Sequence, residues 1–256
     1  MEFLKWRAED GVAIVTINRP PANALAQQLI RELDELMTEV EHNNDVRVVL
    51  LHGEGRFFSA GADIKEFTDV SSEQQAVNLA ENGQAAFDRL ESFPKPVIAA
   101  IHGAALGGGL ELAMSCHIRY VAEDAKLGLP ELNLGIIPGF GGTQRLPRYV
   151  GLAKAAEMIF TGEPISGAEA VQWGLANKAV PQEELLPQAL ELAKKIAKKS
   201  PVSLKAAIHA LQYSKKSFEE GIKAEAEQFG LVFNSEDAKE GIQAFIEKRQ
   251  PTFSGK

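Results

Sequence analysis

Two glutamates in this sequence sit among apolar residues with glycines close by. Glu111 follows the glycine-rich run GAALGGG and has a leucine on each side, and Glu131 is the lone acid in LGLPELNLGIIPGFGGTQR, residues 127–145. Poor solvation raises the pKa of a carboxyl group, and two such groups close together raise each other's pKa further. Carboxyls of that kind perform general acid–base chemistry near neutral pH. The pair therefore predicts a proton-transfer site, whereas either glutamate alone could simply cap a helix or pair with an arginine such as Arg145.

The glycines before Glu111 fit the start of a helix better than a nucleotide-binding loop. The dinucleotide pattern fails because Leu112 stands where its last glycine is required, and the P-loop pattern fails because no Lys-Ser/Thr follows Gly108. At a helix start, unpaired N–H groups and the positive end of the dipole can face a developing negative charge. Glycine lets a ligand approach that backbone closely. Tight packing of a strand against a helix is the alternative role for glycines 107–109.

Other common catalytic patterns are absent from the sequence. The segment FFSAG, residues 57–61, lacks the first glycine of a nucleophile elbow. The five histidines show no metal-binding spacing among themselves or with the single cysteine. We therefore expect neither a metal site nor a catalytic serine.

Composition limits the class of protein. The chain has 256 residues, of which 45% are hydrophobic and 24% charged, and its net charge of −8 argues against a general binder of nucleic acid or anionic membranes. Cys116 is the only cysteine, so no disulfide forms within the chain, and a reducing compartment fits. The start MEFLKWRAEDG lacks the apolar core of a secretory signal, and no apolar run is long enough to span a bilayer. These features favour a cytoplasmic protein.

Strand and helix patterns alternate through the first half of the chain, which predicts an α/β fold. Residues 2–20 show two strand-like runs around a Glu-Asp-Gly turn, and residues 24–44 carry leucines and a valine (residues 25, 29, 33, 36 and 40) at helical spacing. Apolar runs at 46–55 and 95–103 predict buried strands, a helix is expected near 73–92, and another at 110–116. Residues 117–130 predict two further short strands.

Helical patterns dominate after about residue 139. Three shorter helices are expected within residues 141–176, followed by four longer ones between residues 183 and 249. The composition changes near residues 200–201. We therefore predict a catalytic core at 1–200 and a C-terminal helical region at 201–256.

Four motifs give the sequence a resemblance that covers almost its full length. They are FFSAGADIKEF (57–67), KPVIAAIHGAALGGGLELAMSC (95–116), LGLPELNLGIIPGFGGTQRLPRYVG (127–151) and GIQAFIEKRQPTF (241–253). The chain resembles the crotonase (enoyl-CoA hydratase/isomerase) superfamily, and most closely its short-chain enoyl-CoA hydratases. The resemblance implies a spiral core of stacked ββα units, followed by helices that form trimers, commonly paired into hexamers.

The resemblance also implies roles for individual residues. Glu111 and Glu131 match the two catalytic glutamates, and the backbone N–H groups of Ala62 and Gly108 match the oxyanion hole for the thioester oxygen. Further matches to substrate- and CoA-binding positions are Ala24, Ala60, Asp63, Ile64, Lys65, Gly139, Phe229 and Lys248. Of these, Gly139 matches a glycine that helps hold the reacting water, whereas Phe229 and Lys248 match residues that reach the CoA of a neighbouring subunit.

The implied reaction is addition of water across C2=C3 of a trans-2-enoyl-CoA. No metal or other cofactor is implied, because CoA is part of the substrate, and neither nucleic acid nor membrane is an expected partner. The alternatives are Δ3–Δ2 enoyl-CoA isomerisation, which relatives achieve with a single glutamate at the Glu131 position, and a non-catalytic or RNA-binding member of the fold. Two departures from the family pattern are His117, where many relatives carry an acid, and a shorter loop at residues 19–25.

Overall fold

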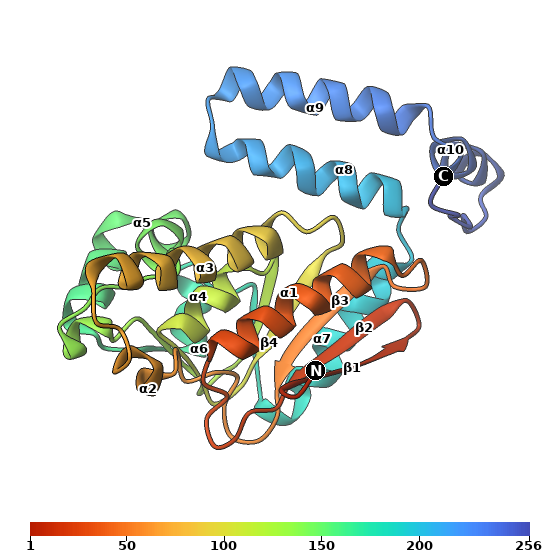
Figure 1. The fold of residues 1–256 in the computed structure, drawn as a ribbon. Coiled ribbons are helices and arrows are strands. Elements are labelled where there is room, and N and C mark those ends of the chain that lie inside the picture. The colour runs from red at the N-terminus through yellow and green to blue at the C-terminus, as the bar shows by residue number, and fades with distance from the viewer.

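A six-stranded sheet forms the centre of the core in the computed structural model, which describes residues 1–256 (Figure 1). Its strands lie in the order β1-β2-β3-β4-β6-β9. Their bounds are Leu4–Glu9, Val12–Ile17, Val48–Gly53, Val97–Ile101, Ile118–Ala122 and Lys178–Val180. Only β1 and β2 pair antiparallel, and all other neighbours are parallel. The valine- and isoleucine-rich runs of β2, β3 and β4 are almost wholly buried, as expected for parallel strands covered on both faces.

The turn between β1 and β2 confirms the predicted hairpin. Asp10 and Gly11 both have positive φ, 48° and 80°, which is the backbone of the tight two-residue turn that matches the strand twist. The hairpin fixes β2 beside β3, in register from the Val12–Val48 pair to the Ile17–Gly53 pair.

Three amphipathic helices pack around this sheet. They are α1 (Gln27–His42), α3 (Glu73–Glu91) and α7 (Gln182–Ala197). Helix α7 packs on β2, β3, β4 and β6, whereas α1 and α3 contact each other. Helix α1 buries the predicted apolar residues from Leu29 to Val40, but Leu25 lies before its first turn and instead bridges to Ala62.

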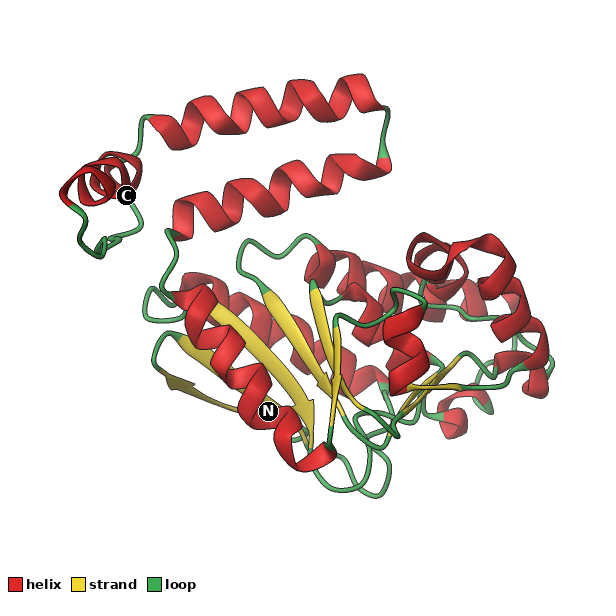
Figure 2. Ribbon diagram, turned by 180° about the vertical axis from the view of Figure 1, so that it is seen from behind, coloured by secondary structure: helices red, strands yellow, loops and turns green.

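A smaller sheet lies beside the main one, next to the predicted site (Figure 2). It contains β5 (Ala104–Leu106), β7 (Lys126–Gly128) and β8 (Ile165–Ser166). Helix α4 (Gly108–Ser115) follows β5, and the 3-10 helix η1 (Glu131–Leu134) follows β7. The parallel pairing of β5 with β7 therefore brings the starts of α4 and η1 together.

The remaining core elements include both confirmed and missed predictions. Helix α5 (Gly142–Thr161) bends at Gly151 (φ 77°), so the two helices expected there are joined across a kink, and α6 is Gly167–Gln172. The short helix α2 (Ile64–Phe67) lies between the strand and helix predicted at 46–55 and 73–92, in a segment for which no helix was predicted. Strands β5, β8 and β9 were not predicted, because runs of two or three residues carry too little alternation to signal a strand.

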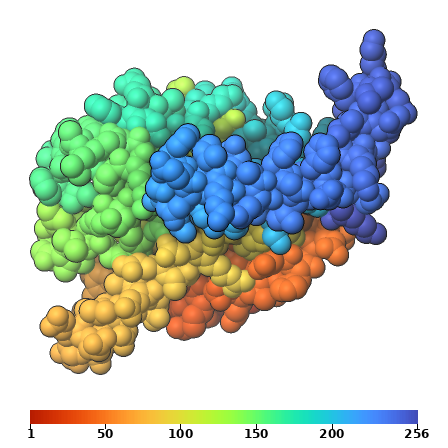
Figure 3. Space-filling view, turned by 90° about the horizontal axis from the view of Figure 1, so that it is seen from above, coloured from red at the N-terminus to blue at the C-terminus, as the bar shows by residue number.

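The last helices form an arm that lies above the core, with α10 at one end (Figures 1 and 3). The arm contains α8 (Pro201–Gln212), the 3-10 helix η2 (Tyr213–Lys215), α9 (Phe218–Phe233) and α10 (Glu236–Glu247). Helices α7, α8, α9 and α10 are the four longer helices expected from the sequence. None of the helices is both long and apolar enough to cross a membrane.

Candidate active site

A pocket of about 120 Å³ opens where α2, α4, η1 and the turn before α5 meet. Glu111 and Glu131 both line it, although they are twenty positions apart in the sequence. Its other lining residues include backbone-exposing small residues and a group of apolar side chains: Ala60, Gly61, Ala62, Gly107, Gly108, Gly139, Ile64, Phe67, Leu134, Ile136, Ile137 and Phe140. The structure thus brings the two predicted carboxyls to one largely apolar pocket.

The Glu111 side chain is held by backbone amides. Helix α4 begins at Gly108, so Glu111 lies in its first turn, with an exposed fraction of 1%. Its Oε1 accepts hydrogen bonds from the N–H groups of Phe140, at 2.9 Å, and Gly142, at 2.7 Å. Because Gly142 is the first residue of α5, Glu111 caps the positive end of that helix. Burial nevertheless raises the pKa of Glu111 to about 7, with a further upward contribution from Glu131.

The Glu131 carboxyl has fewer partners. It stands at the first position of η1, and its Oε2 is buried without a hydrogen-bond partner. A Cβ added to Gly107 would lie 3.0 Å from Oε1 of Glu131, so the glycine leaves space for this carboxyl. Burial raises the pKa of Glu131. The predicted upward shift is therefore found for both glutamates, with burial as the main cause in each case.

Two backbone N–H groups at the pocket have no acceptor in the chain. Ala62 is bridged to Leu25, but the bridge uses the amides of Leu25 and Asp63 and leaves that of Ala62 free. Gly108 begins α4, and its N–H is one of the unpaired donors of a helix N-terminus. A Cβ added to Gly108 would lie 3.4 Å from the Ala62 nitrogen. The two amides therefore border the same small space.

The glycines of this segment have different roles. Gly107 has φ 51°, a left-handed conformation that lets the chain turn from β5 into α4. A Cβ on Gly109 would lie 2.4 Å from the carbonyl oxygen of Ser59, so this glycine permits close packing of α4 on the loop after β3. The predicted helix start therefore lies at Gly108, and the alternative role, close packing, applies to Gly109.

The predicted CoA-binding segment lies partly in the pocket. Ala60, Ile64 and Gly139 line it, whereas Asp63 and Lys65 do not. Asp63 caps α2 and pairs with Arg19 at 2.5 Å. Arg19 also donates to the carbonyl oxygen of Ala24 at 3.1 Å. No role was predicted for Arg19 from the sequence. Its side chain nevertheless connects the loop containing Ala24 to the segment containing Asp63.

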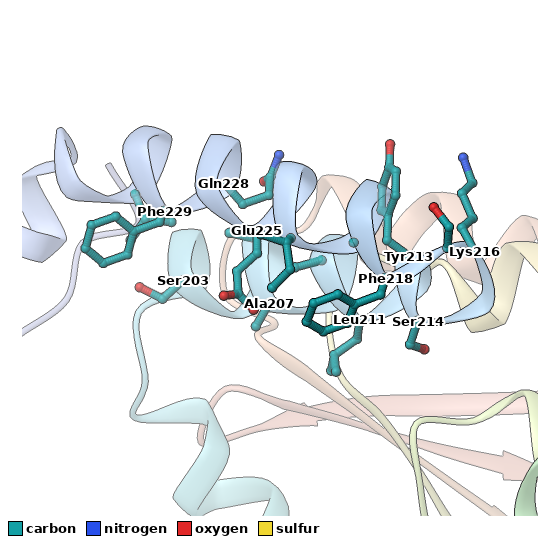
Figure 4. A pocket seen from close by; sticks show the side chains of 16 residues that line it. Ser203, Ala207, Leu211, Tyr213, Ser214, Lys216, Phe218, Glu225, Gln228 and Phe229 are labelled. Atoms are coloured by element: carbon teal, nitrogen blue, oxygen red, sulfur yellow. The ribbon is translucent and has the colours of Figure 1, made fainter.

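Phe229 and Lys248 lie on the arm, away from the pocket that holds the two glutamates. Phe229 lines one end of a separate open groove between α8 and α9, and Phe218 and Leu211 line the groove toward its other end (Figure 4). Lys248 caps α10 with φ 56°. Within one chain the structure does not bring these two residues to the glutamates.

Several residues near the pocket were not identified from the sequence. Leu134, Ile136 and Ile137 border its opening with exposed fractions of 57, 41 and 69%, an unusual exposure for large apolar side chains. Their position between the glycines of the Glu131 loop was the only signal available. His117, noted as a departure, is not at the pocket. Its Nδ1 accepts from the N–H of Val97 at 2.9 Å, and burial lowers its pKa to about 4, so it is a neutral structural residue.

Comparison with known proteins agrees with this geometry. The sequence profile described as enoyl-CoA hydratase/isomerase matches residues 7–256. The chain belongs to this family. It is 58% identical over 258 residues to the "Probable enoyl-CoA hydratase" of Bacillus subtilis, covering 100% of each chain. It is 45% identical to the "Short-chain-enoyl-CoA hydratase" of Clostridium acetobutylicum, covering 94% of each.

A solved structure extends the likeness to the fold. The crystal structure of enoyl-CoA hydratase from Bacillus anthracis superposes with a TM-score of 0.94 at 39% identity, covering 99% of this chain and 100% of the other. This match confirms the predicted fold class, a crotonase-type α/β core with a C-terminal helical region. Membership of the enoyl-CoA hydratase/isomerase family also explains why three of the four motifs, at 57–67, 95–116 and 127–151, converge on one pocket, while the fourth, at 241–253, lies on the arm.

Proposed function

We propose that the chain hydrates short-chain trans-2-enoyl-CoA thioesters to 3-hydroxyacyl-CoA, as in fatty-acid β-oxidation. The observation that carries the proposal is the joint presence, in one pocket, of the Glu111 and Glu131 carboxyls and the two unpaired amides of Ala62 and Gly108. Family membership and the names of the relatives support the same reaction.

The amides of Ala62 and Gly108 form the oxyanion hole in this proposal. When water adds to C3, negative charge develops on the thioester oxygen as the C2 side becomes an enolate. Fixed N–H donors stabilise that charge without reorganisation, and one such donor contributes a factor of about 10²–10³ in rate at comparable sites. The dipole of α4 adds to this, because Gly108 is its first residue.

The two glutamates hold the water and move the protons. Burial raises the pKa of both carboxyls, which favours a state in which the pair holds one proton. The ionised carboxylate of Glu111 accepts a proton from water as the water oxygen bonds to C3, and the acid form of Glu131 gives its proton to C2. The pair holds one proton before and after, so the net change is addition of H and OH across the double bond.

The remaining assignments belong to the same proposal. Ala60, Ile64 and Gly139 contact the substrate at the pocket, and Ala24, Asp63 and Lys65 frame its CoA portion, a placement supported by the Arg19 contacts. Phe229 and Lys248 reach the CoA of a neighbouring subunit in a trimer or hexamer. No metal or separate cofactor is required, and a cytoplasmic location remains the expectation.

The decisive experiment replaces each glutamate with glutamine, which keeps its shape but removes its acid–base capacity. We expect Glu111→Gln and Glu131→Gln each to lower kcat for crotonyl-CoA hydration by at least ~100-fold, the usual contribution of general acid–base catalysis. Circular dichroism should show an unchanged fold. Near-wild-type turnover in either variant would contradict the paired mechanism.

A parallel assay separates hydration from isomerisation. The wild-type chain is incubated with a 3-enoyl-CoA and, separately, with the 2-enoyl-CoA of equal length. The presence of Glu111 beside Glu131 predicts faster turnover of the 2-enoyl substrate. Faster conversion of the 3-enoyl substrate would instead favour the isomerase.

A further inference from the structure

Arg145 lies beneath the turn that leads into α5 and is almost fully buried, with an exposed fraction of 4%. Its Nη1 donates to the carbonyl oxygen of Phe140 at 2.8 Å. The backbone of Gly141 also lies against this guanidinium, since a Cβ added to Gly141 would lie 2.3 Å from the same nitrogen. A left-handed glycine (φ 99°) is therefore required at residue 141 to let the turn close over the guanidinium.

The same turn holds the Glu111 carboxyl. The N–H groups of Phe140 and Gly142 both donate to Oε1 of Glu111, while the carbonyl oxygen of Phe140 accepts from Arg145. Phe140 is thus fixed at both of its peptide groups, one side by the carboxylate and the other by the guanidinium. Because both of these hydrogen bonds are to Oε1, the second carboxyl oxygen of Glu111 remains for the reacting water.

Acidic residues of α3 fix the orientation of Arg145. Its Nη2 pairs with Asp88 at 2.5 Å, and its Nε pairs with Glu91 at 3.1 Å. The other oxygen of Glu91 accepts from Lys215 at 2.7 Å, in the η2 turn of the arm. The planar guanidinium therefore uses all three of its nitrogens to join α3 to the turn, a geometry that the point charge of a lysine cannot reproduce.

We propose that Arg145 is a positioning residue for the reaction: it fixes the turn at residues 138–142, whose amides hold Glu111 in the orientation that presents its free oxygen to water. This inference rests on the proposed hydratase function. Arg145 does not line the pocket, so it acts through the turn and not on the substrate. From the sequence, Arg145 was expected only as a possible ion-pair partner for Glu111 or Glu131. In the structure it pairs instead with Asp88 and Glu91.

The test compares Arg145→Lys, Arg145→Met and the control Arg148→Met in crotonyl-CoA hydration. Arg148 lies on the same helix, is exposed and makes no ion pair or side-chain hydrogen bond. We expect kcat to fall ~10–100-fold in Arg145→Met and ~10-fold in Arg145→Lys, because small misplacements of a catalytic group have effects of this size. KM should change by less than ~3-fold, since no substrate contact is lost. Arg148→Met should match the wild type.

A pH profile gives a readout that a purely structural role would not move. The charged groups acting on Glu111 are Glu131, which raises its pKa, and Arg145, which lowers it together with the two turn amides. Loss of the Arg145 charge and of a fixed turn therefore raises the pKa of Glu111. The acid limb of the kcat profile should move to higher pH in Arg145→Met and stay in place in Arg148→Met.

A double-mutant cycle tests whether Arg145 acts through Glu111. In a Glu111→Gln background, Arg145→Met should lower the residual rate by less than ~3-fold, because the group it positions is already inactive. Multiplicative losses, or folded Arg145 variants with unchanged kcat and pH profile, would overturn the proposal. If both Arg145 variants fail to fold, Glu91→Gln can be used instead, because it removes one ion pair that orients the Arg145 guanidinium. An unaltered kcat in Glu91→Gln would then overturn the proposal. A wild-type chain that hydrates no enoyl-CoA would overturn the proposed function and this inference together.

Discussion

Glu111 and Glu32 are both buried glutamates whose oxygens accept backbone amides, yet their pKa values move in opposite directions. Glu111 has two amide donors on one oxygen and the Glu131 carboxyl nearby, and burial raises its pKa to about 7. Burial also acts upward on Glu32, but four donors, the amides of Glu2, Phe3 and Leu4 and the side chain of Gln28, outweigh it and lower the pKa. Deeper burial, fewer donors and the neighbouring Glu131 carboxyl therefore raise the pKa of Glu111, whereas the donors around Glu32 keep that carboxyl ionised near neutral pH.

This difference predicts a pH-dependent gain in stability for Glu111→Gln. The folded-state pKa of Glu111 is about 7, above its ordinary value of 4.5, so its contribution to stability is full below pH 4.5 and is lost as pH rises through 7. Glutamine resembles the protonated form at every pH. We expect the variant to exceed the wild type in free energy of unfolding by up to ~3 kcal/mol at pH 8 and to match it near pH 4.5. Denaturant unfolding at fixed protein concentration measures both values.

The matched control is Glu32→Gln, at the other buried glutamate. Because the folded state lowers the pKa of Glu32, removal of its charge should destabilise the protein at pH 8. A Glu111→Gln variant less stable than the wild type at pH 8 would show that the Glu111 carboxylate is stabilised by its amides rather than strained by burial.

At the scale of elements, the first two residues of α4, Gly108 and Gly109, lie in different surroundings. Gly108 borders the free amide of Ala62, whereas Gly109 packs on the Ser59 carbonyl. An added methyl group would therefore meet different surroundings at the two positions. At Gly108 the nearest atoms are 3.3 and 3.4 Å away, and at Gly109 the nearest is a backbone oxygen at 2.4 Å.

These contacts predict opposite outcomes for two adjacent alanine substitutions. Gly108→Ala should fold with a melting temperature within a few degrees of the wild type but lose ~10–100-fold in kcat/KM for crotonyl-CoA, because the methyl group enters the space between the two oxyanion donors. Gly109→Ala should lower the free energy of unfolding by ~1–3 kcal/mol through overpacking. Thermal melts and initial rates on both variants test this. A Gly108→Ala variant with full activity would argue against the proposed oxyanion hole.

Sequence patterns were sufficient to predict the long strands and helices, and to predict that the two glutamates of the pocket lie together. The apolar runs of β2, β3 and β4 and the spacing of α1 identified the central layers, and Glu111 and Glu131 were paired by their apolar surroundings. Three strands were missed, because β5, β8 and β9 are defined by pairing and not by their own sequence. The ion pairs of Arg19 with Asp63 and of Arg145 with α3 could not be predicted either, since each joins residues more than forty positions apart in the chain.

At the scale of the whole molecule, the arm exposes an unusual number of large apolar side chains. Phe218, Phe229, Phe233, Phe245 and Ile246 have exposed fractions between 58 and 85%. They lie on α9 and α10, the helices farthest along the arm (Figure 1). Phe229 and Phe233 lie side by side, with ring centroids 5.8 Å apart, and exposed apolar groups of this kind mark surfaces that bind another protein. It supports the prediction that the region at 201–256 joins subunits into a trimer or hexamer.

Phe245→Glu should therefore weaken assembly. We expect the wild type to have three or six times the 27.7 kDa mass of one chain in sedimentation equilibrium, and the variant to shift toward the monomer, because a carboxylate replaces an apolar side chain at the interface. Gln250→Glu, just after the same helix, makes the same charge change at an exposed polar side chain, and it should leave the mass unchanged. The monomeric variant should also show a raised KM for crotonyl-CoA, since Phe229 and Lys248 would no longer reach a neighbour's CoA. A monomeric wild type, or a dissociated variant with unchanged KM, would contradict the shared site.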